Sequence, residues 1–359
     1  MSAPPPRASR SALVADLSRY ALLVLCFYFV AAYAIAALGR MPHPYELEWL
    51  EGSHVDHVAR VVAGEPLYVA PTVDFVPHAT TPLYYWVAAA LTPILGIGFL
   101  PLRLVSFAAS LGCLAVLFRL VERETADRHA ALAAAAIFAA TYPLSGHWLD
   151  LARVDALALL FVLLGALGLR GPVTPGRQAL AGVAFGAAFF TWQVALLVIV
   201  PLCAYAALAG RGLGRAVFPA TSLGLVAVGC GLGWAASDGW FAHYVFTVPQ
   251  SALGAASSAP GAPFEAADAG PLIEEAARTL PVIGLLALAF AVPLIARRRG
   301  HDASFFFCLT IGLLGASWAE HALFGAARNA LLPAGAVLAL LAGLSIHALP
   351  RLAAARGSA

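Results

Sequence analysis

Carboxylates and arginines that could do chemistry gather in two stretches between apolar blocks. The first stretch is acidic. Its charged residues are Glu46, Glu48, Glu51, Asp56, Glu65 and Asp74 against Arg40 and Arg60. In the second, Asp150, Arg153 and Asp155 fall within six residues at the start of an apolar block. A carboxylate can take a proton from a nearby hydroxyl group, and a guanidinium suits an oxyanion. Such groups at a membrane boundary also pair with each other, and both interpretations stay open.

The first stretch also has the pattern of an ordered segment. Ser53 is placed to cap a helix that runs to Gly64, Asp56 follows three residues later as in a capping box, and Pro66 stops continuation. Glu51 would then lie at the start of this helix, next to the membrane surface.

Two histidines in the same segment are candidate metal ligands by residue type. His54 and His57 stand three residues apart, close to Glu51 and Asp56. This spacing is neither the i, i+4 pair of a zincin helix nor a closed four-ligand set. The sequence therefore favours a site that requires no metal, with His54 and His57 as the weak candidate ligands.

The elements that position these residues must be membrane helices. Of 359 residues, 61% are hydrophobic and 11% are charged, with a mean hydropathy of +0.84. Soluble domains carry about 25% charged residues. The apolar blocks are about 17 to 22 residues long, which suits helices that cross roughly 30 Å of hydrocarbon. The net charge of +2, without a basic stripe, argues against nucleic acid as a partner. The composition predicts an all-α polytopic membrane protein.

Arginine positions orient the spans, because cytoplasmic loops collect basic residues. Arg-rich loops placed inside give ten crossings and two cytoplasmic termini. The crossings are expected near 21–39, 101–120, 130–146, 155–169, 179–190, 193–209, 216–236, 280–296, 303–319 and 330–348. Residues 83–99 should not cross, and the helices on either side of Thr191, Trp192 and Gln193 should be tilted or broken.

This topology predicts one transmembrane domain over residues 21–349. Short cytoplasmic tails, residues 1–20 and 350–359, flank it. The outer loops are expected at 40–81, 146–155, 237–279 and 320–329.

The order of these features resembles the GT-C glycosyltransferases. An acidic residue is followed by a helix and Gly64, then by Glu65 to Tyr68, then by Thr81 to Tyr85, and Asp155 comes after the third crossing. The nearest branch resembles the bacterial relatives of protein O-mannosyltransferases and lipid A aminoarabinose transferases. The likeness covers about residues 21–201, with weaker echoes at Gly239-Trp240-Phe241 and Arg328-Asn329.

The resemblance implies a helical bundle of about ten crossings with interfacial helices in the first outer loop. It also implies transfer of a sugar from a polyprenyl-phosphate donor to an acceptor at the outer face of a bacterial inner membrane, with inversion. The partners would be the lipid bilayer, the lipid-linked sugar and an unidentified acceptor. An acidic residue of the first outer loop would be the general base.

Carried over by position, Glu51 matches the second member of the family's acidic pair, and Leu50 stands where the first is usual. Family position favours Glu51 as the base; Glu48, one turn earlier, could reach the same place, or activity could be lost. Asp155 matches the acidic residue of the second outer loop. The candidates for binding substrate or phosphate are Arg153, Arg328, Tyr84 and His78.

Two other classes of protein would also explain many crossings. A secondary transporter usually shows repeated halves and ionisable groups near the midplane, whereas the charges here sit at loop level. A non-catalytic scaffold with a glycosyltransferase-like fold is the other alternative, which Leu50 keeps open.

Overall fold

A computed structural model describes residues 10–209, 214–251, 274, 284, 300–324 and 328–357. Throughout these residues the regular structure is helical, and they contain no strand. The all-α architecture predicted from composition is confirmed.

Within the described ranges, five helices are long and apolar enough to cross a membrane. They are α1 (Arg10–Arg40), α5 (Phe99–Thr125), α10 (Gly214–Ala236), α15 (Gly300–Phe324) and α16 (Leu331–Gly357). At a rise of 1.5 Å per residue, even the 23-residue α10 is about 35 Å long, more than the hydrocarbon thickness. These five helices coincide with five of the ten predicted crossings.

Four further predicted crossings fall on shorter helices. These are α6 (Arg128–Ala140), α7 (Asp155–Leu169), α8 (Pro175–Thr191) and α9 (Leu196–Ala209). The crossing expected at 130–146 is helical only to Ala140, because turns containing Pro143 and Gly146 follow it. The break expected after Thr191 is present: Trp192 is extended and the 3-10 helix η1 (Gln193–Ala195) leads into α9.

The remaining predictions of topology lie largely outside the described residues. These include the crossing at 280–296, the Arg-rich loop at 297–299 and most of the outer loop at 237–279. The part of that loop that is described contains the short helix α11 (Trp240–Ala242) and the π-helix η2 (His243–Thr247). The count of ten crossings stays a prediction.

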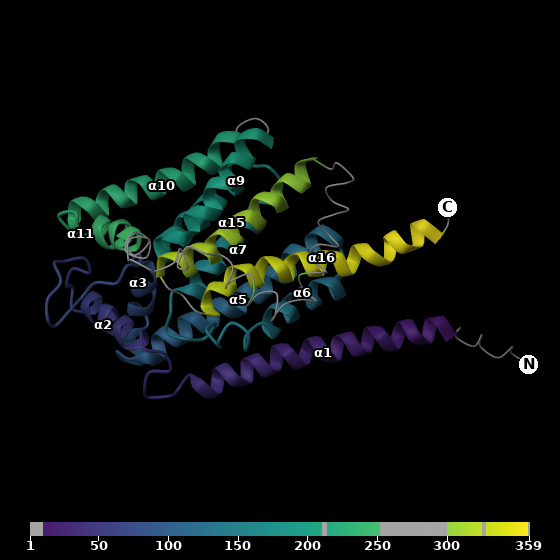
Figure 1. The fold of residues 1–359 in the computed structure, drawn as a ribbon, viewed down its shortest axis with the longest axis horizontal. Helices are drawn as coiled ribbons and strands as arrows, with labels where there is room; N and C mark the ends of the chain where they lie inside the picture. Colours follow the sequence, from purple (N-terminus) through teal and green to yellow (C-terminus); the bar gives the residue numbers. More distant parts are fainter. Residues whose placement is uncertain are drawn as a thin grey trace, which may run out of the picture.

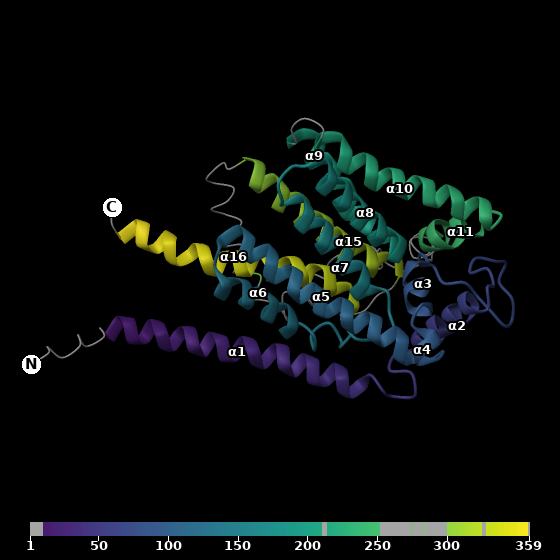
Figure 2. The same ribbon diagram turned by 180° about the vertical axis from the view of Figure 1, so that it is seen from behind.

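The segment 83–99 does not form a membrane-length helix. It contains α3 (Leu83–Ala89) and α4 (Thr92–Leu95), which at 1.5 Å per residue are about 10 and 6 Å long. Neither is long enough to cross. Helix α3 packs on the amphipathic helix α2 (Glu51–Val62) at one end of the molecule, and α4 lies at the same end (Figure 2).

The bundle has a packed centre and two peripheral helices. Helices α1 and α10 run along opposite edges of the bundle (Figures 1 and 2). Only 17% of the most apolar stretch of α1 and 11% of that of α10 is buried. Between them, α7 packs on α5 and α8, and α16 packs on α6 and α15. Alanine makes up most of the buried face of α6, which lets the neighbouring helices approach closely.

The ends of the bundle differ. The start of α1 and the end of α16 lie at one end, and α2, α3 and α4 gather at the other (Figure 2). The start of α5 reaches the α2 end, so the 27 residues of α5 connect the two ends.

Helix α2 begins at Glu51, the residue expected at its start, but Leu50 and not Ser53 is its cap residue. The hydroxyl group of Ser53 instead pairs with His78 Nε2 at 2.6 Å. The Glu51 carboxylate accepts a hydrogen bond from the Leu47 N–H at 2.7 Å, which orders the turn before the helix.

Candidate functional site

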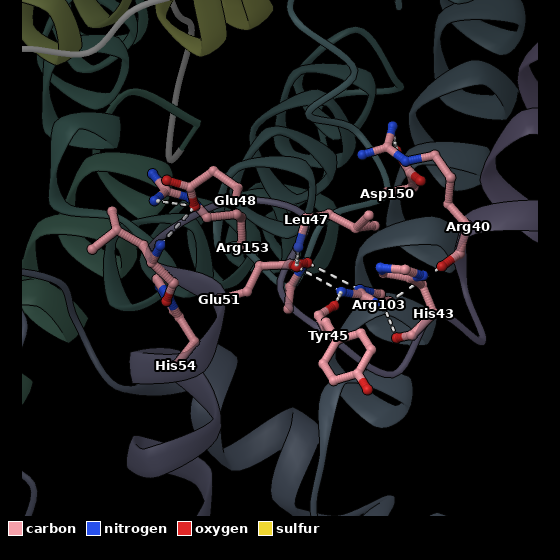
Figure 3. A network of polar contacts seen from close by, with 12 residues as sticks. Arg40, His43, Tyr45, Leu47, Glu48, Glu51, His54, Arg103, Asp150 and Arg153 are labelled. Atoms are coloured by element: carbon pink, nitrogen blue, oxygen red, sulfur yellow. Dashed lines mark hydrogen bonds and ion pairs between the residues drawn. The ribbon is translucent and has the colours of Figure 1, made fainter.

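The site is built where two loops meet over the start of α5. The first loop joins α1 to α2, and the second, residues 141–154, joins α6 to α7. Arg103 on α5 lies between them and contacts the first loop and α2 (Figure 3). Segments far apart in the sequence thus supply one cluster of charged side chains.

Glu51 is fully buried, and both of its carboxylate oxygens are engaged twice. Oε1 accepts from Arg103 Nε at 3.0 Å and from the Ala152 N–H at 2.7 Å. Oε2 accepts from Arg103 Nη2 and from the Leu47 N–H, each at 2.7 Å. Burial alone would raise the pKa of Glu51, but these hydrogen bonds outweigh it and hold the pKa below its ordinary value. Glu51 is an ion-paired anion with its acceptor sites filled.

Arg103 is equally well coordinated. Beyond its two bonds to Glu51, Nη1 donates to the His43 carbonyl at 2.6 Å and Nη2 donates to the Tyr45 carbonyl at 2.7 Å. Its guanidinium also lies 4.8 Å from the centre of the Phe99 ring. A buried arginine with this many partners fixes the first loop against α5.

Glu48 has a different environment, although it is only three residues away. Its Oε2 accepts from the Leu50 N–H at 3.1 Å and lies 3.5 Å from Arg153 Nη1. Its Oε1 is buried and has no hydrogen-bond partner among the described residues. Burial raises the pKa of Glu48, and the opposing charge of Arg153 does not fully compensate. Glu48 is therefore a carboxylate with acceptor capacity to spare.

Arg153 links this carboxylate to Asp155, the first residue of α7. Arg153 Nε lies 3.3 Å from Asp155 Oδ2, and Asn329 Nδ2 donates to Asp155 Oδ1 at 3.2 Å. Asn329 belongs to η4 (Arg328–Ala330), the 3-10 helix before α16. The two contacts of Arg153 to carboxylates are long, and its guanidinium stacks 4.7 Å from the Trp148 ring centre. Its geometry leaves donors available for a further oxyanion.

The loop that carries Arg153 is held by hydrogen bonds that involve α3 and α5. Tyr84 on α3 pairs with Ser106 Oγ at 3.0 Å, and the hydroxyl of Ser106 donates to the Arg153 carbonyl at 2.9 Å. Tyr84 also donates to the Leu102 carbonyl at 2.9 Å. The predicted substrate contact Tyr84 is thus a fully buried tie between α3, α5 and the second loop.

The other edge of the second loop is tied to α1. Arg40 donates to the hydroxyl of Tyr142 at 2.6 Å and lies 3.4 Å from Asp150, to which Tyr142 also donates at 2.8 Å. Gly146 turns the chain with a φ of +73°, and a Cβ there would lie 2.8 Å from the Trp148 indole nitrogen. A side chain at residue 146 would therefore disturb the ring beneath Arg153.

The three histidines of this region form a neutral stack. The His54 and His78 rings lie 4.8 Å apart, and those of His57 and His78 lie 4.9 Å apart. Burial lowers the pKa of His57 to about 4, of His78 to about 3, and of His54 well below its ordinary value. His78 is therefore uncharged at neutral pH, and it could contribute to phosphate binding only as a neutral group.

The same stack constrains metal binding. His57 donates from Nδ1 to the Ser53 carbonyl at 2.7 Å, and its Nε2 accepts the His78 N–H at 2.9 Å, so neither nitrogen is available. His54 donates from Nδ1 to the Leu50 carbonyl, which leaves its buried Nε2 lone pair without a partner in the described part of the chain. No group of three His, Cys, Asp or Glu side chains with metal-ligand geometry is found among the described residues.

The structure brings together four of the predicted residues: Glu48, Glu51, Arg153 and Asp155. Arg328 differs, because its side chain is exposed and lies at the edge of the cluster, next to Gly146. It stands near the mouth of the site, whereas its neighbour Asn329 points inward to Asp155.

Two buried residues of the cluster were not predicted. Arg103 holds Glu51, and Glu320 on α15 shares with Asp155 the lining of a small cavity of about 30 Å³. Glu320 Oε2 has no partner among the described residues. Both are ionisable residues within otherwise apolar spans, a signal that marks functional or strongly paired groups.

Together these groups provide a proton acceptor and an oxyanion-binding cation in contact with one another. Glu48 has a free oxygen, Arg153 has donors to spare, and Asp155 orients Arg153. This combination fits a reaction in which an acceptor loses a proton while a phosphate group departs.

Part of the chain matches the model of a known protein family. Residues 78–234, less than half of the chain, match the family described as dolichyl-phosphate-mannose-protein mannosyltransferase. The matched range includes Arg103, Arg153 and Asp155 but not the first loop. No curated protein matches the sequence.

Comparison with solved structures gives ArnT from Cupriavidus metallidurans in two states. The apo state matches with a TM-score of 0.56 and 16% identity, and the state bound to undecaprenyl phosphate matches with 0.57 and 15%. Each match covers 89% of this chain and 59% of ArnT, so the chain spans about three fifths of that protein's length. The chain therefore has a fold similar to that of ArnT, which confirms the helical membrane fold expected from the resemblance to the GT-C glycosyltransferases.

Proposed function

From a GT-C fold that holds an under-coordinated carboxylate beside an arginine, we propose that this chain is a membrane glycosyltransferase. It moves a sugar from a polyprenyl-phosphate donor to an acceptor hydroxyl group. The observation that carries the proposal is the difference between the two carboxylate oxygens of Glu48. The buried Oε1 has no partner within the described residues, whereas Oε2 faces Arg153.

Glu48 is the general base in this proposal. It accepts the proton of the acceptor hydroxyl as that oxygen bonds to the anomeric carbon and the bond from this carbon to the phosphate oxygen breaks. A raised pKa makes a carboxylate a better proton acceptor once it is ionised. Displacement from the face opposite the phosphate inverts the anomeric centre.

Arg153 stabilises the departing polyprenyl phosphate. A guanidinium binds two phosphate oxygens at once, and burial strengthens that attraction. Asp155 and Asn329 position Arg153 and touch neither substrate. His54 Nε2, a buried acceptor without a partner among the described residues, can orient the incoming hydroxyl group.

Glu51 is assigned a positioning role. The position that it shares with the family's acidic pair favoured it as the base, but all its acceptor sites are filled by Arg103 and two backbone amides. Glu48 supplies the acidic group that Leu50 lacks, from one turn earlier in the chain.

The donor and the side of the membrane are also part of the proposal. ArnT, which has this fold, was solved with undecaprenyl phosphate bound, and this supports a polyprenyl-phosphate donor here. The site lies at the end of the bundle that is opposite the two chain termini (Figure 1). With the termini in the cytoplasm, as the arginine distribution predicts, the site faces the outer side.

The test is a transfer assay with the purified full chain and polyprenyl-phosphate sugars as donors. Glu48→Gln should reduce transfer at least 100-fold with the fold preserved, because loss of a general base costs about 10²–10⁴ in rate. Asp74→Asn is the matched control, since Asp74 is an exposed acidic residue of the predicted outer loop 40–81. Full activity in Glu48→Gln would contradict the assignment of the base.

The same assay separates the alternatives. A scaffold would show no turnover with any polyprenyl-phosphate sugar, and a transporter would move solute across sealed vesicles without consuming the donor. Either result would contradict the proposed function.

A further inference from the structure

A second charged cavity lies at the other end of the bundle. It has a volume of about 370 Å³ and is lined by Arg119, Glu122, Arg123, Leu167 and Arg177. The last turns of α5, the end of α7 and the first turn of α8 line this open cavity, in which Arg123 is exposed and Arg177 is half-buried. Arg103 and Arg123 are 20 residues apart on α5, which corresponds to about 30 Å along the helix. The cavity therefore lies at the opposite membrane boundary from the candidate active site.

The positive charge of this cavity is not balanced from within. Its single carboxylate, Glu122, accepts from Arg119 at 2.8 Å and from Arg128, outside the cavity, at 3.0 Å. Arg123 and Arg177 have no ion-pair partner among the described residues. Two guanidinium groups therefore share one cavity with no carboxylate of their own.

Arg177 is held in place rather than spread over the surface. Its guanidinium lies on Gly171, where an added Cβ would come within 2.2 Å of Nε and of one terminal nitrogen. Its Nε is buried and has no acceptor in the described part of the chain. A buried donor without an acceptor is costly, and an oxygen-rich ligand in the cavity would satisfy it.

The neighbouring arginine shows the alternative arrangement. Arg170 forms a two-point ion pair with Glu124, with both nitrogen–oxygen distances at 2.7 Å, and stacks on Phe305 and Phe306. The fold thus supplies a carboxylate partner for Arg170, whereas it supplies none among the described residues for Arg123 and Arg177.

We propose that this cavity binds the phosphate group of an anionic phospholipid from the leaflet opposite the active site. Arg123 and Arg177 donate to the phosphate oxygens, and Leu167 contacts the apolar part of the lipid below the headgroup. Basic pockets between transmembrane helices bind anionic headgroups in this way. The site is separate from the proposed transferase site and does not depend on its activity.

The test measures binding of phosphatidylglycerol to the full chain in zwitterionic detergent micelles by native mass spectrometry. The double variant Arg123→Gln/Arg177→Gln should bind at least tenfold more weakly. Arg215→Gln is the matched control, because it removes a positive charge at the start of α10 without lining the cavity, and it should change binding less than twofold. Equal weakening in both variants, or in neither, would overturn the site.

A second variant keeps the test valid if the double variant does not fold. Gly171→Ala leaves the net charge unchanged but displaces the Arg177 guanidinium, and it should weaken phosphatidylglycerol binding several-fold. Binding equal to that of the unaltered chain would count against the proposal.

Inorganic phosphate and glycerol phosphate serve as the soluble probes. They should bind at least 100-fold more weakly than phosphatidylglycerol, because they lack the lipid part that contacts Leu167. Comparable affinity, lost in the same arginine variants, would show a site for free phosphate and overturn the assignment to a lipid.

Discussion

Glu51 and Glu48 lie three residues apart, and both are largely buried, yet their environments are opposite. Glu51 has four hydrogen bonds from Arg103, Ala152 and Leu47. Glu48 has one good hydrogen bond, one long contact to Arg153 and one oxygen without a partner in the described residues. Burial of a carboxylate is therefore not itself a sign of catalysis. The completeness of its coordination separates a structural anion from one that can take a proton.

The comparison predicts that stability and activity separate between the two residues. Changes around Glu51 should mainly reduce folding stability, because they leave buried charge unpaired. Changes at Glu48 should mainly reduce activity, because few interactions of the fold depend on it.

The largest loss of stability is expected for Arg103→Ala. This variant leaves the Glu51 carboxylate buried without its cation and frees the carbonyls of His43 and Tyr45. Breaking a buried ion pair in this way costs about 3–5 kcal/mol. Thermal unfolding in detergent is the measurement, and Arg60→Ala, which removes a more exposed pair with Glu65, is the control. Similar unfolding temperatures in the two variants would remove the structural role of Arg103.

The sharpest form of the comparison is a pair of matched substitutions. Glu51→Gln keeps the size of the side chain but weakens four hydrogen bonds, and it should destabilise the fold by about 1–3 kcal/mol. Glu48→Gln should be as stable as the unaltered chain or more so, because it removes a buried, poorly compensated acid. Thermal unfolding of the two variants side by side is the measurement. A larger loss of stability in Glu48→Gln than in Glu51→Gln would reverse the assignment of roles.

A smaller effect is expected for Tyr84→Phe, which removes hydrogen bonds to the Leu102 carbonyl and to Ser106. The cost in stability should be about 1 kcal/mol. Because Ser106 holds the Arg153 backbone, transfer activity should fall several-fold, mainly in kcat. A change confined to KM for the donor would indicate that Tyr84 contacts substrate directly.

The smallest effect is the pH dependence, and the two carboxylates should give it opposite signs. The pKa of Glu51 is lowered in the fold, so its contribution to stability is present above the pKa of the unfolded chain and is lost as the pH falls. The pKa of Glu48 is raised, so its contribution is present at low pH and is lost as the pH rises through the folded value. Unfolding of each Gln variant and the unaltered chain between pH 4 and 7 should give difference curves with opposite slopes.

Much of the fold could be predicted because the membrane imposes simple rules. The lengths of apolar blocks locate α1, α5, α10, α15 and α16, and the residues around Trp192 predict the break between α8 and α9. The cap of α2 was assigned wrongly to Ser53, because the cap pattern there was stronger than any local signal at Leu50. The side chain that orders this turn, Arg103, comes from another helix, and a local pattern cannot reveal it.

The candidate site was partly accessible from sequence. Glu48, Glu51, Arg153 and Asp155 stand out because charge is rare in this chain and gathers at span ends. Their relative roles could not be predicted, since they depend on which backbone amides and cations fill each oxygen. Glu320 was missed as a member of the cluster because Asp155, with which it lines the small cavity, is more than 160 residues earlier in the chain.

The Ala152 amide that completes the coordination of Glu51 is 101 residues further along the chain. A ribosome that adds about 5–20 residues per second needs about 5–20 s to supply it after Glu51 emerges. Arg103 arrives after 52 residues, about halfway through that interval. Glu51 can therefore pair with Arg103 once α5 has been made, but its coordination is complete only after the loop between α6 and α7 has followed, so the folding of the first loop depends on the order in which the membrane helices are delivered.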